Sequence, residues 1–204
     1  DGRIETSVWC SLFDGERNRF WGGRSSSEYD PAQFGSNPSV IEASGCRFVL
    51  DPREGKSVGA IEDGGGSCAW RLTWRPVDGP LGEPLSIFPY KWMLTAGFPR
   101  SKTLTPHPAL RFEGAIEWDG VRLEVKDWVG MQGHNWGSEH SPRYAWGQCE
   151  FAADGSPPCV VEAFSGCIRV AGRLTPPFSA LVVRRGAETY AFNALVDLWN
   201  QKAE

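Results

Sequence analysis

The segment GMQGHNWGSEHSPRYAW, residues 130–146, gathers side chains that can do chemistry. It contains His134, Trp136, Tyr144 and Trp146 within seventeen positions. An imidazole exchanges a proton near neutral pH, and aromatic faces attract a cation-like centre through their quadrupoles. A proton donor beside aromatic rings is suited to protonating an alkene and guiding the carbocation that forms. The segment therefore predicts a site rather than a piece of core.

A carboxyl partner for this imidazole stands in the next apolar strand. Residues two apart share one face of a strand, so His134 and Trp136 are expected to point to the same side. By the same period Glu162 shares a face with Val160, and pairing with residues 144–151 would turn it inward. A carboxylate among apolar neighbours must find a partner or face water, and an apolar cavity would shift its pKa. The predicted catalytic residues are His134 and Glu162.

Aromatic side chains are expected to line the pocket around this pair. The stretch CAWRLTWRP puts Cys68, Trp70, Leu72 and Trp74 on one face of a half-buried strand, and arginines on the other. Residues 144–150 alternate in the same way. The predicted substrate-binding residues are Trp136, Tyr144, Trp146, Gln148, Trp70 and Trp74.

The other chemistries examined have weaker support in the sequence. His107, between two prolines, is interpreted as structural or as part of a pocket mouth, and His140 as part of a solvated loop. His134 and His140 are six residues apart, which matches none of the short spacings of zinc sites, so no metal is predicted. The sequence contains no GxSxG motif for a serine nucleophile. We expect no cofactor.

Alternation with period two dominates the chain and predicts strands joined in hairpins. The clearest hairpin covers residues 110–128, with an Asp119–Gly120 turn. Helix signals are poor, the best being ALVDLWNQKA after Asn193, a possible N-cap. Further strands are predicted at 9–13, 46–50, 68–76, 144–151, 159–166, 180–185 and 188–192, and irregular segments at 22–40 and 75–108.

Many short strands with hairpin turns predict an all-β fold built as an antiparallel β-barrel, with a β-sandwich as the alternative. A small barrel of eight strands can enclose one small ligand, which fits the aromatic wall. We expect a barrel domain over residues 1–166, with a Pro-rich connector near 76–108. Residues 167–204 would form a C-terminal extension.

The composition of the chain limits the classes of partner that we expect. The net charge of −4 is scattered along 204 residues, which gives no basic footprint for nucleic acid or an anionic membrane. No apolar run approaches the roughly 18 residues of a transmembrane segment. The six cysteines lack CxxC spacing and are interpreted as free thiols, which favours the cytoplasm. The expected partner is a small hydrophobic molecule, and the oligomeric state stays open.

The runs GHNWG, YAWGQCEF and VVEAFSG resemble a signature of the lipocalin-like carotenoid 1,2-hydratases, also called hydroxyneurosporene synthases. FPRSKTLTPHPALRFEGAIEWDG is similar to the family's link into the signature strand. Tocopherol cyclases and certain fungal Diels–Alderases look like more distant relatives. The resemblance covers about residues 68–185.

This resemblance implies two lipocalin-like barrel halves with an apolar ligand between or within them. Residues 167–204 would then begin a second, reduced barrel half rather than a C-terminal extension. The hydratases add water across a terminal isoprenoid double bond by protonation, without a cofactor. His134 and Trp136 match the family's His-x-Trp, and Glu162 falls near its acidic residue. The chain departs from the family at Val160-Val161-Glu162, where hydratases favour Tyr-x-Asp, which puts hydration itself in question.

Three functions follow as hypotheses. The first is a cofactor-independent hydratase (a lyase) or cyclase (an isomerase) acting on an apolar, unsaturated isoprenoid or polyketide-like molecule by acid catalysis. The second is a lipocalin-like carrier that holds a hydrophobic ligand without changing it. The third is a pericyclic ring closure promoted by the shape of the cavity, which needs no acid.

Overall fold

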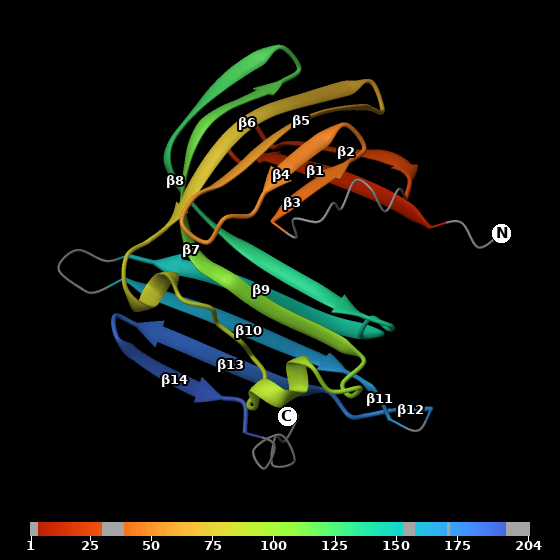
Figure 1. Cartoon of the computed structure of the whole chain (residues 1–204), viewed down its shortest axis with the longest axis vertical. Coiled ribbons are helices and arrows are strands. Elements are labelled where there is room, and N and C mark those ends of the chain that lie inside the picture. Colours follow the sequence, from red (N-terminus) through yellow and green to blue (C-terminus); the bar gives the residue numbers. More distant parts are fainter. Residues whose placement is uncertain (1–3, 30–38, 153–157, 171, 195–204) are drawn as a thin grey trace. The chain divides into compact units, whose positions relative to one another are not determined.

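The structure is a computed structural model that describes residues 4–29, 39–152, 158–170 and 172–194 (Figure 1). Over these residues the fold is all-β, its sheets are antiparallel, and the helical segments are short 3-10 turns. The predicted helix after Asn193 lies outside the described residues, except for its first residue, which is not helical.

The chain folds into two compact units, which are described separately. The first unit comprises Asp1–Arg75 and Arg111–Trp128, and the second comprises Pro76–Leu110 and Val129–Glu204. Two long strands, β7 (Ser101–Trp118) and β8 (Val121–Gly137), contribute residues to both units. The domain boundary expected at residue 166 lies inside the second unit.

The first unit is built from hairpins around a small apolar core. Its cluster of buried residues contains Val8, Ala43, Cys46 and Ile61. The predicted face of the tryptophan-rich strand is confirmed, because Cys68 and Trp74 are buried while the arginines of that strand are exposed. The strands are β1 (Glu5–Asp14), β2 (Arg19–Glu28), β3 (Val40–Ala43), β4 (Cys46–Val49), β5 (Gly55–Asp63) and β6 (Gly66–Pro76).

The predicted turn between β7 and β8 is confirmed. Asp119 and Gly120 have φ angles of 50° and 77°, and positive φ at both central residues is what a tight type I′ hairpin turn requires. The hairpin is longer than the sequence indicated, since β7 begins at Ser101 within the segment expected to be irregular.

Prolines hid the first half of β7 from sequence analysis. Thr105 exchanges backbone hydrogen bonds with Leu85, and the carbonyl of Ala109 accepts one from Val77. Backbone groups alternate between the two edges of a strand, so Pro106 and Pro108 face the other edge. These bonds therefore do not need the N–H groups that proline lacks, and the expectation of an irregular connector over 101–108 was wrong.

The rest of the connector is fixed to the second unit. It carries two 3-10 turns, η2 (Pro80–Gly82) and η3 (Lys91–Leu94). The guanidinium of buried Arg184 donates to the carbonyl oxygens of Pro80, Glu83 and Pro84 at 2.8, 2.7 and 3.1 Å. The side-chain amide of Asn193 donates to the carbonyl of Ile87 at 2.8 Å. The connector is thus held by polar contacts as well as by apolar packing.

A four-stranded antiparallel sheet lies in the second unit (Figure 1). Its order is β14-β13-β10-β9, so both predicted hairpins are confirmed. Val160 and Val182 of its inner face pack in one cluster with Leu81, Leu85 and Ala109. The strands are β9 (Arg143–Phe151), β10 (Cys159–Cys167), β13 (Phe178–Arg185) and β14 (Glu188–Phe192), with the short pair β11 (Arg169–Val170) and β12 (Arg173–Leu174).

The sheets are open over the described residues. Their strand orders run β1-β2, β3-β4-β5-β6-β7-β8, β14-β13-β10-β9 and β11-β12, and none returns to its first strand to close a barrel. The predicted closed barrel is therefore not seen, and the open sheets fit the alternative prediction, a β-sandwich, as well as an open barrel. The loop expected over residues 22–40 is corrected in part, because β2 continues to Glu28; residues 30–38 are outside the described part of the chain.

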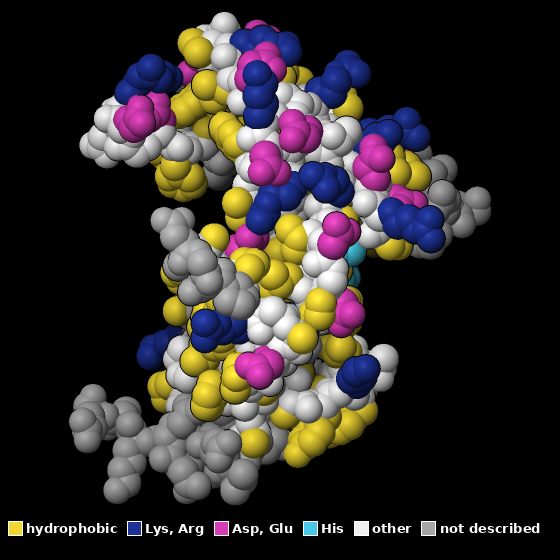
Figure 2. Space-filling model, turned by 90° about the vertical axis from the view of Figure 1, so that its left-hand side faces the viewer, with side chains coloured by type: hydrophobic (Ala, Val, Ile, Leu, Met, Phe, Trp, Pro, Cys, Tyr) yellow, Lys and Arg dark blue, Asp and Glu magenta, His cyan; other side chains and the backbone are white. Residues whose placement is uncertain are grey.

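The surface carries both signs of charge. On the face shown in Figure 2, lysine and arginine side chains are interspersed with aspartate and glutamate rather than gathered into a basic field. All six cysteines are free thiols, and Cys46, Cys68 and Cys167 are buried whereas Cys149 is exposed. In the part of the chain that the structure describes, no helix is long and apolar enough to cross a membrane.

Candidate functional site: a buried carboxyl group in the second unit

Glu162 is the most unusual side chain in the second unit, because it is a carboxyl group with 0% of its surface exposed. It lies on β10 opposite Gln148 of β9 and Val182 of β13. The two-residue period of β10 puts Glu162 on the same face as Val160, which is also 0% exposed. The prediction that hairpin pairing would turn this carboxyl group inward is confirmed.

The two oxygens of Glu162 have different surroundings. The hydroxyl of Thr105 donates to Oε1 at 3.0 Å, and the indole N–H of Trp146 donates to the same oxygen at 3.0 Å. Oε2 is buried and has no hydrogen-bond partner among the described residues. A buried polar atom without a partner is costly and marks the position where a further group can bind.

This environment favours the neutral acid. Burial raises the pKa of Glu162 above its ordinary value of 4.5, since the charged form loses its hydration, while the hydrogen bonds from Trp146 and Thr105 oppose that rise. Both donors point at Oε1, which must therefore act as the acceptor. The proton of the neutral acid consequently belongs on Oε2, the oxygen without a partner.

Aromatic side chains adjoin Glu162 on the inner face of the sheet. Trp146 stands opposite Phe164, and Tyr144 stacks on Phe164 with ring centroids 6.3 Å apart. Gln148, the third residue of this predicted face, donates from Nε2 to the carbonyl of Pro108 at 2.6 Å. The structure thus places Trp146 and Gln148 beside Glu162, whereas Tyr144 lies further along β9, opposite Gly166, and is exposed.

His134 and Trp136 lie elsewhere. Their rings stack at a centroid distance of 4.9 Å, so they do share a side, but His134 is exposed and Trp136 only partly buried. No hydrogen bond or ion pair among the described residues joins His134 to Glu162.

Trp70 and Trp74 serve the packing of the first unit. The indole N–H of Trp70 donates to the Ser57 hydroxyl at 2.6 Å. Trp74 is 7% exposed and packs against Phe112, with ring centroids 5.7 Å apart. Both are therefore held in the interior of a unit that does not contain Glu162.

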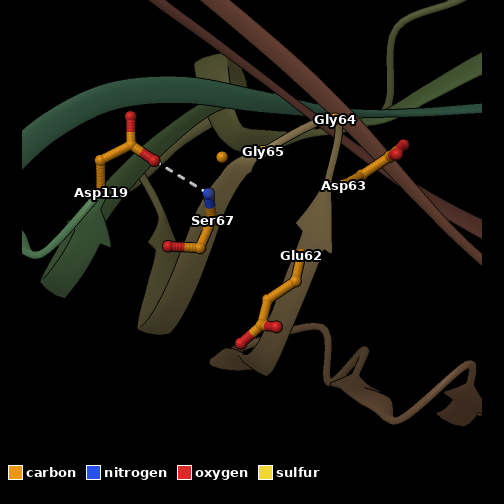
Figure 3. A pocket seen from close by; sticks show the side chains of 7 residues that line it. Glu62, Asp63, Gly64, Gly65, Ser67 and Asp119 are labelled. Atoms are coloured by element: carbon orange, nitrogen blue, oxygen red, sulfur yellow. Dashed lines mark hydrogen bonds between the residues drawn. The ribbon is translucent and has the colours of Figure 1, made fainter.

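Among the described residues, two surface hollows stand out, and neither is lined by His134 or Glu162. The first, of about 600 Å³, is an open polar hollow at the β5–β6 turn, where Asp119 accepts a hydrogen bond from the Ser67 backbone (Figure 3). The second measures about 10 Å³ and includes His140, which is room for about one water molecule. The enclosed apolar cavity that the sequence predicted at His134 and Trp136 is neither of these.

Metal chemistry has no ligand set among the described residues, where no group of three or more histidine, cysteine, aspartate or glutamate side chains could hold an ion.

Thr105 is the functional residue that sequence reasoning missed. It was assigned to the irregular connector, so nothing indicated that it would face Glu162. The available signal was the alternation of Thr103, Thr105 and His107 between neighbouring apolar residues and prolines, which is compatible with a strand at a sheet edge.

Comparison with known proteins gives no relative on which to place this site. No protein-family model matches the chain, and no curated protein or solved structure matches it either. The resemblance to the carotenoid hydratases therefore stays a prediction, and the site must be judged by its own geometry.

Proposed function

We propose that this chain is a cofactor-independent enzyme that uses Glu162 to protonate a small, apolar, unsaturated molecule, which is then hydrated or cyclised. The observation that carries the proposal is the fully buried carboxyl group whose Oε2 has no partner. A neutral acid surrounded by aromatic and aliphatic side chains is suited to giving its proton to a weakly basic carbon. The fold is proposed to be lipocalin-like and the location cytoplasmic, in keeping with six free thiols.

The chemistry balances without a cofactor. The O–H bond at Oε2 breaks as a C–H bond forms at one end of the alkene, which leaves a carbocation and the Glu162 carboxylate. In hydration, water adds to the cation and its released proton returns to the carboxylate. In cyclisation, a second double bond attacks the cation, and the carboxylate removes a proton from the ring product. Rings such as Trp146 and Tyr144 can stabilise the cation through their faces.

Trp146 is the side chain through which Glu162 can be reached. Thr105, its other hydrogen-bond partner, is 0% exposed, whereas Trp146 is 41% exposed. Rotation of this indole would open a path to the carboxyl group at the cost of one hydrogen bond, a net change of about 1 kcal/mol.

The test is turnover of acyclic isoprenoid alkenes in D2O by Glu162→Gln. Because Gln has no proton of suitable acidity, we expect the rate to fall by about 100-fold or more, together with the incorporation of solvent deuterium into product carbon. Glu117→Gln, which changes an exposed glutamate of β7, is the control and keeps full activity. Equal turnover by Glu162→Gln and the unaltered protein would remove acid catalysis from the account.

His134, the second predicted catalytic residue, is tested in the same assay. Its exposure favours a role outside the protonation step, so His134→Ala is expected to retain turnover. A loss as large as that of Glu162→Gln would restore His134 to the mechanism.

A carrier is the second candidate, because the hydrogen bonds from Thr105 and Trp146 to Oε1 of Glu162 are also compatible with a structural role for this carboxyl group. Mass spectrometry of ligand extracted from the purified protein separates the two functions. An unaltered hydrophobic ligand that is bound equally by Glu162→Gln indicates a carrier, whereas a hydrated or cyclised product indicates an enzyme. Ring closure promoted by the shape of the cavity alone would give cyclised product with the unaltered protein and with Glu162→Gln.

A further inference from the structure

The second unit contains another buried polar atom without a partner, Nδ1 of His107. Among the described residues the only other unpartnered buried side-chain atoms are Oε2 of Glu162 and the indole nitrogen of Trp118, which belongs to the first unit. Buried polar atoms are nearly always paired with protein or ordered water. Because one of these atoms belongs to an acid and the other to an imidazole of the same unit, a single bound group could satisfy both.

His107 lies on the side of β7 that faces Glu162 of β10, which belongs to another sheet. Thr105 of β7 bonds Glu162 directly, and Ala109 packs in the cluster that holds Val160 and Val182. His107 stands between Thr105 and Ala109, and the two-residue period gives all three the same face. Alternate positions on a strand are about 7 Å apart, so the imidazole is one step along β7 from the residue that touches Glu162.

We propose that His107 is the second polar residue of the Glu162 site, and that its Nδ1 and Oε2 of Glu162 together hold one or two small neutral groups that both donate and accept hydrogen bonds. Water and the hydroxyl of a bound molecule have this property. A neutral acid donates from Oε2, and a neutral imidazole accepts or donates at Nδ1 according to its tautomer, so a hydroxyl satisfies either arrangement.

This inference rests on the proposed function and deepens it, because it places the water molecule for hydration between Glu162 and His107. Water held there would stand beside the cation that Glu162 generates. Its oxygen forms the new C–O bond, and its O–H bond breaks with the proton returning to the Glu162 carboxylate. His107 then acts as a positioning residue: it orients the water and neither gives nor takes a proton in the reaction.

Infrared spectroscopy of the resting protein tests the contact. The difference between unaltered protein and Glu162→Gln identifies the carbonyl stretch of the protonated Glu162 carboxyl group. His107→Leu removes the orienting nitrogen, so we expect this band to move to higher frequency, as it does when an acid loses a hydrogen bond. His107→Asn, whose amide occupies nearly the place of Nδ1, is expected to restore the band. The exposed His140→Leu is the matched control.

The source of the hydroxyl follows from the same spectra. A shift in His107→Leu without added ligand identifies water, and a shift seen only with geraniol, an acyclic isoprenoid alcohol, identifies a ligand hydroxyl. A folded His107→Leu whose band stays in place both with and without geraniol overturns the inference. Because these spectra need no turnover, that failure is distinct from failure of the proposed function, which the Glu162→Gln assay measures.

A high-resolution crystal structure of the unaltered protein gives an independent decision if His107→Leu does not fold. One or two ordered oxygen atoms that link Nδ1 of His107 to Oε2 of Glu162 by hydrogen bonds support the inference. Nδ1 bonded to another protein group overturns it.

Discussion

At the scale of single residues, the central feature is the difference in hydrogen bonding between the two carboxyl oxygens of Glu162. Oε1 of Glu162 accepts two hydrogen bonds, while Oε2 is equally buried and accepts none from the described residues. An ordinary structural carboxylate would have donors at both oxygens. In the proposed function, this asymmetry gives the neutral acid a defined position for its proton, on Oε2.

The pH dependence of stability is the first prediction at this scale. The pKa of Glu162 is raised in the folded state, so the unfolded chain binds fewer protons at this group between the two pKa values. Its contribution is therefore fully present below its ordinary pKa of 4.5 and is lost as pH rises through the folded pKa. Urea unfolding at a series of pH values should show this decline, and Glu162→Gln should lack it. An unchanged profile in the variant would contradict the raised pKa.

Trp146→Phe gives the second residue-scale prediction. The change keeps an aromatic ring but removes the N–H that donates to Oε1 of Glu162. Because that hydrogen bond lowers the pKa of the acid, its loss should raise the pKa further. The measurement is the infrared titration of the Glu162 carboxyl group, with Tyr144→Phe as a control that leaves the pKa in place. A lower pKa in Trp146→Phe would mean that water has replaced the indole.

At the scale of elements, Arg184 of β13 fixes the connector. Its side chain is 8% exposed and satisfies three carbonyl groups of residues 80–84. Arg184→Met keeps much of the apolar volume but leaves those carbonyls without donors, so it should destabilise the protein by about 2 to 4 kcal/mol. Arg185→Met, at the neighbouring exposed position, is expected to change stability by less than about 0.5 kcal/mol. Urea unfolding measures the stability of both variants. Equal losses would show that the hydrogen bonds of Arg184 to the connector do not stabilise the fold.

The sequence predicted the hairpins well because their signals are local. The Asp119–Gly120 turn and the alternation on either side specify β7 and β8 without reference to any distant residue. The pairing of β9 with β10 followed from the same periodicity. Since the face of a strand is set by counting in twos, the inward orientation of Glu162 could be predicted as well.

What the sequence could not supply was the identity of residues that meet across layers. The hydrogen bond between Thr105 and Glu162 joins positions 57 residues apart, and no local pattern encodes it. His134 was misplaced for a related reason: alternation fixed which side it shares with Trp136 but not which side of the sheet is covered. The prolines of residues 106 and 108 concealed a strand whose hydrogen bonds do not use their nitrogen atoms.

At the scale of the whole molecule, tryptophans packed on glycines organise the first unit. A Cβ at Gly55 would lie 2.0 Å from the Trp74 ring, and one at Gly59 would lie 2.4 Å from the Trp70 ring. Gly55→Ala should therefore force the ring aside and cost about 1 to 3 kcal/mol. Gly15→Ala, where nothing lies within 4 Å, is the matched control. If both variants unfold at the same urea concentration, the ring does not pack there.

The division into two units assigns these effects to different places. Gly55 belongs to the first unit and Glu162 to the second, so hydrogen exchange should show loss of protection in the first unit for Gly55→Ala. The pKa of Glu162 should be unaffected by that change, since its raised value comes from burial within its own unit.

The most direct measurement is a 13C NMR titration of the side-chain carboxyl carbon of Glu162, assigned by its disappearance in Glu162→Gln. A buried acid that can donate its proton should titrate with a midpoint above 4.5. A midpoint at or below 4.5 would mean that burial does not favour the neutral acid, which contradicts the proposed role of Glu162 as a proton donor.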